Sequence, residues 1–205
     1  MRVLVLEAEP GAADRAAAAL EAASHTVDRC HDAGATGFPC RAVDGTGPCP
    51  LETQPVAVAL TVRPSGSSVG AIEDGVACAI RANVPLVVAG ETDDNPYAQW
   101  TAAIAPGAHD EDVVAACERA AAAPLPRHTR AASERLRRVL RHRDVDGAES
   151  ARALVTRHEG RLRIQILLPD GVPPDVVRAA GMYVLAEVHA LDPTARGADV
   201  SLGTA

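Results

Sequence analysis

The run VAVALTV at residues 56–62 limits the fold of this chain more than any other feature, because its apolar and β-branched residues leave neither face of a strand polar. A strand of this kind must be covered on both sides, as strands in parallel sheets are. Similar runs occur as RVLVLE at 2–7 and VPLVVAG at 84–90. Together the three runs predict the buried centre of a parallel sheet.

Segments of helical composition separate these runs, at residues 11–24, 67–83 and 110–123, and weaker strand patterns occur at 25–30 and 101–107. Alternating strands and helices with short connections are typical of doubly wound folds. We therefore expect residues 1–123 to form an α/β domain with five parallel strands and helices on both faces of the sheet. Since aromatic residues make up only 2% of the chain, its core must consist of Ala, Val, Leu and Ile.

The motif PLPRH at 124–128 interrupts the alternation, because closely spaced prolines end helices and remove backbone donors. We expect a linker there. Charge also changes at this point: residues 1–126 hold 7 arginines against 17 acids, whereas residues 127–205 hold 13 against 10. The rest of the chain predicts a small α+β domain at 129–205 with the order αββαβ, built from a basic helix (127–143), a hairpin turning near 159–160, a helix (172–191) and a strand (198–203).

The first half resembles the receiver domain of bacterial response regulators. VLVLEAEP is similar to the family's first strand and acidic cluster, so Glu7 and Glu9 stand near the positions of its Mg²⁺-binding acids. VALTVRPSG is similar to the third strand, whose end carries the phosphoacceptor aspartate in the family. The corresponding residue here is Thr61. The resemblance implies a flavodoxin-like fold over about 120 residues.

The chain departs from the receiver pattern at the positions that perform phosphotransfer. Ala89 and Gly90 stand where the family has Ser or Thr, Ala105-Pro106 replaces Lys-Pro, and the chain contains no lysine. Phosphotransfer needs a carboxylate nucleophile, a metal and a cation at the acyl phosphate, and two of these three are missing. We therefore predict a pseudo-receiver that is not an enzyme and that regulates or scaffolds through protein contacts. The alternation alone equally favours any other flavodoxin-like domain.

The second half is similar, in element order only, to the cytoplasmic domain of cation-efflux transporters and to alkaline shock family domains. No metal-binding motif of the former matches this chain. A three-stranded sheet with an Ile- and Leu-rich face and few elements to cover it leaves apolar surface, which predicts an isologous homodimer.

The segment RCHDAGATGFPCRAVDGTGPCPLE at 29–52 contains Cys30, His31, Cys40 and Cys49, and we call residues 30–52 the cysteine loop. In a reducing cytosol, thiols serve as metal ligands, redox groups or buried apolar residues. The spacing is not that of Cys-x2-4-Cys zinc motifs. However, the glycines let the loop fold back, so three thiolates and the imidazole could bind Zn²⁺ or an iron–sulfur cluster.

Two alternatives for the cysteine loop remain open, a redox-active pair of Cys40 and Cys49, and inert thiols. Cys78 and Cys117 lie on apolar helix faces and are expected in the core. A metal- or redox-sensing protein is therefore the alternative to the pseudo-receiver.

The basic helix at 127–143 carries seven arginines against a single acid, Glu134. Four of these arginines lie outside the apolar face of the helix: Arg130, Arg137, Arg138 and Arg141. Their charge predicts a contact with an acidic protein partner or with the acidic first domain. A net charge of −7 and the lack of an aromatic platform disfavour nucleic acid. No run approaches the roughly 20 apolar residues needed to cross a membrane, and the N-terminus lacks a signal-peptide pattern, so we expect a soluble, cytoplasmic protein.

Overall fold

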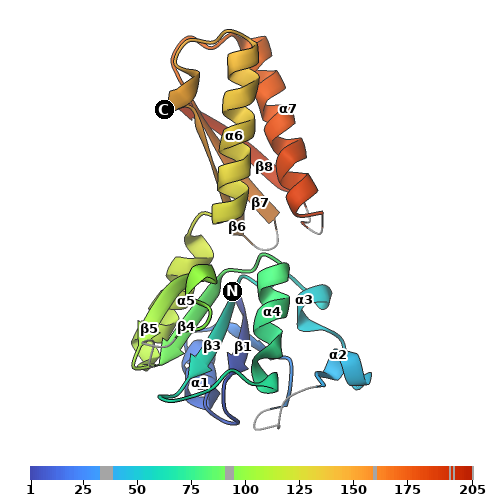
Figure 1. Cartoon of the computed structure of the whole chain (residues 1–205), viewed down its shortest axis with the longest axis vertical. Helices are drawn as coiled ribbons and strands as arrows, with labels where there is room; N and C mark the ends of the chain where they lie inside the picture. Colours follow the sequence, from blue (N-terminus) through green and yellow to red (C-terminus); the bar gives the residue numbers. More distant parts are fainter. Residues whose placement is uncertain (33–38, 91–94, 159–160, 194, 196, 205) are drawn as a thin grey trace. The chain divides into compact units, whose positions relative to one another are not determined.

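The computed structural model describes residues 1–32, 39–90, 95–158, 161–193, 195 and 197–204 (Figure 1). The chain divides into two compact units, Met1–Ala123 and Pro124–Ala205. Within the described residues, every helix is too short or too polar to cross a membrane.

The first unit is built on a five-stranded parallel sheet with the order β2-β1-β3-β4-β5. Its strands are β1 (Arg2–Glu7), β2 (Thr26–Arg29), β3 (Val58–Arg63), β4 (Leu86–Gly90) and β5 (Thr101–Pro106). The expected α/β class and parallel sheet are confirmed, and the strand order is that of flavodoxin-like folds.

Helices cover both faces of this sheet, as Figure 1 shows. They are α1 (Asp14–Ala22), α4 (Asp74–Arg81) and α5 (Asp110–Ala122), with the 3₁₀ turns η1 (Ala71–Glu73) and η2 (Ala98–Trp100). Alternate residues of the strands divide the core into two apolar clusters. One cluster joins Val5 and Leu60 to α1 and α5, and the other joins Leu6 and Val88 to α4.

The cysteine loop contains two one-turn helices, α2 (Arg41–Asp44) and α3 (Pro50–Thr53), where the sequence predicts irregular structure. Cys40 directly precedes the first helix and Cys49 the second. Residues 33–38 of the loop lie outside the described residues.

The second unit consists of α6 (Pro126–His142), η3 (Ala148–Ser150), β6 (Arg152–His158), β7 (Arg161–Leu168), α7 (Pro174–Leu191) and β8 (Ala198–Thr204). A separate three-stranded sheet has the order β6-β7-β8, in which β7 is antiparallel to β6 and parallel to β8. The predicted turn at 159–160 lies outside the described residues. Residues 124–128, predicted as a linker, contain Leu125 in the core of this unit and the first turn of α6.

Strand β7 is the central strand of the second unit, and apolar and polar residues alternate along most of it, so that one face is buried. Leu162, Ile164 and Ile166 are fully buried in the cluster that contains α6 and α7. Val200 and Leu202 of β8 are in register with Ile164 and Ile166, yet they are 41% and 58% exposed. The edge strand β8 therefore presents apolar side chains that the two helices do not cover.

Gly90 at the end of β4 provides a test of the sheet. It has φ +107°, and an added Cβ would lie 2.1 Å from the carbonyl oxygen of Arg63. We expect Gly90→Ala to lower the free energy of unfolding by about 3 kcal/mol or more, because it combines backbone strain with a backbone clash. Gly66→Ala is the matched control: Gly66 has φ +77° and open space around it, so strain alone should cost roughly 1 kcal/mol. Urea denaturation measures both, and equal losses would contradict the described strand pairing.

Candidate functional site

Charged residues gather where the central strands end: Glu7 closes β1 and Arg63 closes β3. Ligands of doubly wound folds bind beyond these carboxyl ends of the strands. The same edge contains Thr61, which the resemblance to receiver domains places at the phosphoacceptor position. It is therefore the first place to look for a site.

Thr61, Arg63 and Glu73 form a buried network at this edge. The Thr61 hydroxyl donates a hydrogen bond of 2.8 Å to Oε1 of Glu73, and Nη1 of Arg63 donates to Oε2 of the same carboxylate. The second guanidinium nitrogen of Arg63 donates to the carbonyl of Ser67 at 2.8 Å. The Glu73 side chain is 0% exposed, so this carboxylate is fully enclosed by its partners. The Thr61 hydroxyl thus forms its hydrogen bond inside the protein, with Glu73.

Tyr97 packs against the outer side of the network, with the Arg63 guanidinium 5.7 Å from the centre of its ring. Burial first, and then the negative charge of Glu73, raise the pKa of Tyr97 to about 12. The phenol therefore stays neutral near pH 7 and adds no second negative charge beside Glu73.

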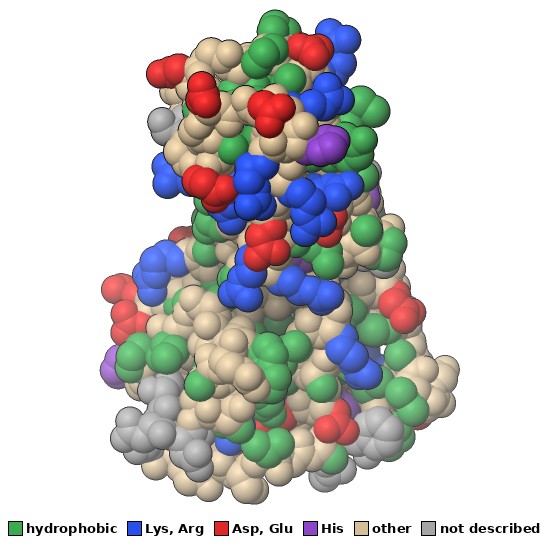
Figure 2. Space-filling model, turned by 45° about the horizontal axis from the view of Figure 1, so that its top comes forward, with side chains coloured by type: hydrophobic (Ala, Val, Ile, Leu, Met, Phe, Trp, Pro, Cys, Tyr) green, Lys and Arg blue, Asp and Glu red, His purple; other side chains and the backbone are tan. Residues whose placement is uncertain are grey.

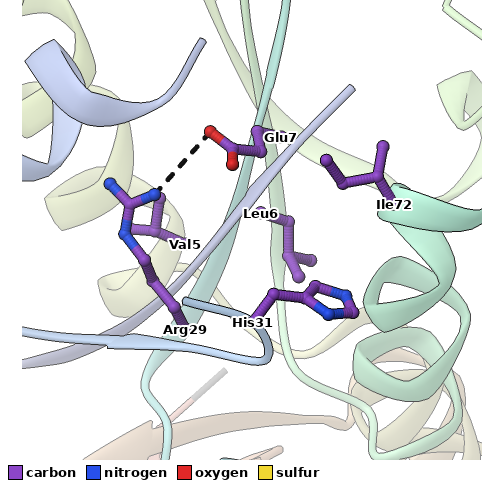
Figure 3. A pocket seen from close by; sticks show the side chains of 6 residues that line it. All are labelled: Val5, Leu6, Glu7, Arg29, His31 and Ile72. Carbon is purple, nitrogen blue, oxygen red and sulfur yellow. Dashed lines mark ion pairs between the residues drawn. The ribbon is translucent and has the colours of Figure 1, made fainter. Parts of the chain in front are cut away.

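Glu7 faces the opposite side of the sheet from Thr61. Thr61 is in register with Leu6, whereas Glu7 is in register with Val62, and adjacent residues of a strand point to opposite faces. The Glu7 carboxylate accepts a hydrogen bond of 3.1 Å from the backbone N–H of Ala13. It also pairs with Arg29 at 3.7 Å, the contact drawn as a dashed line in Figure 3.

Glu9, the second acid of the receiver-like cluster, is exposed and accepts a hydrogen bond of 3.0 Å from the Ser67 hydroxyl. The cavity beside Glu7 has a volume of about 10 Å³ and is lined by Val5, Leu6, Glu7, Arg29, His31 and Ile72. Such a space accommodates about one water. A Mg²⁺ ion needs octahedral oxygen ligands and usually keeps several waters, so these residues do not fit the ion of the receiver family.

The cysteine loop brings its thiols toward one apolar cluster. Cys30 is buried in the cluster that contains α4, and Cys40 packs against it. The backbone N–H of Arg41 donates to the carbonyl of Cys30 at 3.2 Å, which fixes the start of α2 beside the end of β2. The pKa of the Cys30 thiol is raised to about 12, first by burial and then by the nearby thiols of Cys40, Cys49 and Cys78.

His31 also lies beside this cluster, since it lines the cavity beside Glu7 together with Leu6, one of the cluster's residues. Its ring lies near Leu6 and Ile72 while Arg29 points toward Glu7 (Figure 3). Its Nε2 atom is buried without a hydrogen-bond partner. Within the described residues, no three His, Cys, Asp or Glu side chains are arranged to hold a metal ion as they stand. The set of Cys30, Cys40, Cys49 and His31 therefore stays a prediction, and its side chains do not form a metal-binding group as they stand.

Sequence reasoning missed Glu73, which lies in a segment predicted only as a helix. Thr61 and Arg63, polar residues within a fully buried strand, are the sequence signal that a buried acid such as Glu73 must be close. Cys78, which was expected in the core, is partly exposed.

The basic residues of α6 differ in their surroundings. Arg130, Arg138 and Arg141 are exposed, whereas Arg137 is half-buried and donates to the carbonyl of Ala151 at 3.3 Å. Arg141 also pairs with Glu149 at 3.6 Å, across a highly exposed contact. Figure 2 shows arginine side chains gathered on the visible face of the second unit.

Comparison with protein-family models finds no match, and comparison with curated proteins finds none either.

The buried network provides a stability test. Glu73→Gln should lower the free energy of unfolding by roughly 3 kcal/mol or more, because it leaves the Arg63 guanidinium buried without its counter-charge. Arg15→Gln is the matched control: it removes the exposed ion pair of Arg15 with Asp110, whose Arg15 side chain is 72% exposed, and should cost less than about 1 kcal/mol. Chemical denaturation measures both variants. A Glu73→Gln protein as stable as the control variant would refute the enclosed network.

Proposed function

We propose that this chain is a cytoplasmic, non-catalytic regulatory or scaffolding protein whose first unit is a receiver-like domain that cannot be phosphorylated. The observation that carries the proposal is the hydrogen bond from Thr61 to the enclosed Glu73 carboxylate. A hydroxyl in that position is not a carboxylate nucleophile, and it already donates its hydrogen bond to Glu73, whose charge Arg63 neutralises. The flavodoxin-like sheet supports the fold part of the proposal.

Signalling by such a protein occurs through contacts with other proteins. Arg130 and Arg138 are exposed, and the residues that the structure describes offer them no ion-pair partner, which suits an acidic protein surface. The uncovered side chains of β8 suit an isologous contact with a second copy of the chain. Each surface belongs to the second unit.

A second candidate function is metal or redox sensing by the cysteine loop. The specific observation in its favour is that Cys30 and Cys40 lie in or against one apolar cluster, with the N–H of Arg41 donating to the carbonyl of Cys30 at 3.2 Å, and that Cys30 packs on Gly75 of the helix that carries Cys78. Thiolates gathered in a small space are soft ligands for zinc-class ions.

The phosphorylation test uses the purified full-length chain with acetyl phosphate and Mg²⁺. We expect no acid-labile phosphate, because Thr61 is not a carboxylate and the chain has no lysine to stabilise an acyl phosphate. Intact-protein mass spectrometry under neutral conditions detects any adduct. Phosphate found on Glu7 or Glu9, and lost in the Glu7→Gln or Glu9→Gln variant, would overturn the proposal.

The homodimer is tested by sedimentation velocity at micromolar concentration. We expect a dimer in the wild type and a shift toward monomer in Leu202→Asp, because the charge would be placed on the uncovered apolar side of β8. Ser201→Asp is the matched control on the opposite face of the same strand and should remain dimeric. A monomeric wild type would remove the dimer from the proposed function.

A further inference from the structure

Four of the five cysteines belong to four different segments that surround one apolar cluster. Cys30 follows β2, Cys40 precedes α2, Cys49 precedes α3, and Cys78 lies within α4. All four are described residues, and all are free thiols. The fifth, Cys117, is buried in the cluster on the other face of the sheet.

Gly75 brings Cys30 into direct contact with α4. A Cβ added to Gly75 would lie 3.2 Å from the Cys30 sulfur and 2.5 Å from a methyl carbon of Leu6. Cys78 follows Gly75 by three residues, and positions separated by three lie on the same side of a helix. Cys30 therefore packs on α4 one turn before Cys78.

Backbone hydrogen bonds bring the cysteine loop to the same place. The N–H of Arg41 donates to the carbonyl of Cys30 at 3.2 Å, which holds Cys40 beside Cys30. The N–H of Gly47 donates back to the carbonyl of Arg41 at 3.0 Å, so the chain returns toward α2 just before Cys49. Cys40 and Leu51, at the two ends of this segment of the cysteine loop, both pack against the cluster that contains Cys30.

Two guanidinium groups accompany the thiols. Nη2 of Arg81 lies 3.5 Å from the sulfur of Cys78, at hydrogen-bond distance. Arg41 lies beside Cys30, since its backbone N–H donates to the Cys30 carbonyl at 3.2 Å and its Nη2 donates to the carbonyl of Arg29 at 3.0 Å. Four thiolates around a divalent ion leave a net charge of −2, which two adjacent arginines can offset.

We propose that Cys30, Cys40, Cys49 and Cys78 together bind one zinc-class divalent ion, with Cys78 rather than His31 as the fourth ligand. The inference rests on the metal-binding function proposed above. Each thiol that binds the ion releases its proton to solvent, so one ion converts four thiols into four thiolates. These four thiols do not form a metal-binding group as they stand, so rotation of the side chains and movement of residues 39–50 must complete the site. The metal–sulfur bonds supply the free energy that orders it.

The ligand set is tested on the full-length chain, purified under reducing conditions without metal and titrated with Co²⁺ and then Zn²⁺. We expect one Co²⁺ per chain, with sulfur-to-cobalt charge-transfer absorption and the intense visible bands of a tetrahedral site, both abolished by Zn²⁺. Cys78→Ser should weaken binding at least 10-fold and alter the spectrum. His31→Ala and Cys117→Ser should bind as the wild type does.

Arg81→Ala tests the surrounding shell, since loss of a group that supports a ligand typically lowers metal affinity about 10- to 100-fold. Its Co²⁺ spectrum should keep the tetrahedral four-sulfur form. An affinity equal to that of the wild type would contradict the role given to Arg81.

The wild type also reports on the site without any variant that could fail to fold. Zn²⁺ should protect the four proposed thiols from alkylation, as peptide mass spectrometry detects, and leave Cys117 unchanged. If His31→Ala loses the metal and Cys78→Ser retains it, the fourth ligand is wrong while the metal-binding function stands. If the reduced wild type binds neither ion, or if Zn²⁺ protects none of the thiols, the four-cysteine ligand set and the metal-binding function are both wrong.

Discussion

Burial of β1, β3 and β4 on both faces is the constraint on which the rest of the first unit depends. A polar side chain within such a strand has no access to water, so it needs an internal partner. Thr61 finds this partner in Glu73, and the charge of Glu73 in turn requires Arg63 at the end of the same strand. The network of Thr61, Arg63 and Glu73 is thus a direct consequence of the burial of β3 on both faces.

Helix α4 connects the two proposed chemistries of the first unit. Glu73 directly precedes this helix, and Cys78 lies within it. An ion bound by Cys78 and Cys30 would therefore act on the helix whose first residues are anchored to Thr61 and Arg63. The opposite face of the sheet, with Glu7 and Arg29, has separate contacts, a water-sized cavity beside Glu7 and a larger pocket of about 270 Å³ lined in part by Val27, Asp28 and Arg29. The proposed ion would act on the α4 side of the sheet.

The local patterns of apolar residues in the sequence were sufficient to predict the α/β class of the first unit and the presence of the two sheets. The run 56–62 contains most of β3, and the alternation of Leu162, Ile164 and Ile166 defines the buried face of β7. The approach of Cys30 to the helix that carries Cys78 could not be predicted in this way, because 48 positions separate the two cysteines and only the packing of α4 on the sheet brings Cys30 against Gly75. His31 was selected as a ligand because it adjoins Cys30, and that assignment stays a prediction.

X-ray absorption spectroscopy at the zinc edge of the zinc-loaded full-length protein tests the central claim most directly. The account predicts four sulfur neighbours at about 2.3 Å and no nitrogen neighbour. Three sulfurs with one nitrogen at about 2.0 Å would contradict the assignment of Cys78 in place of His31. Two or fewer sulfurs would contradict the four-thiol site itself.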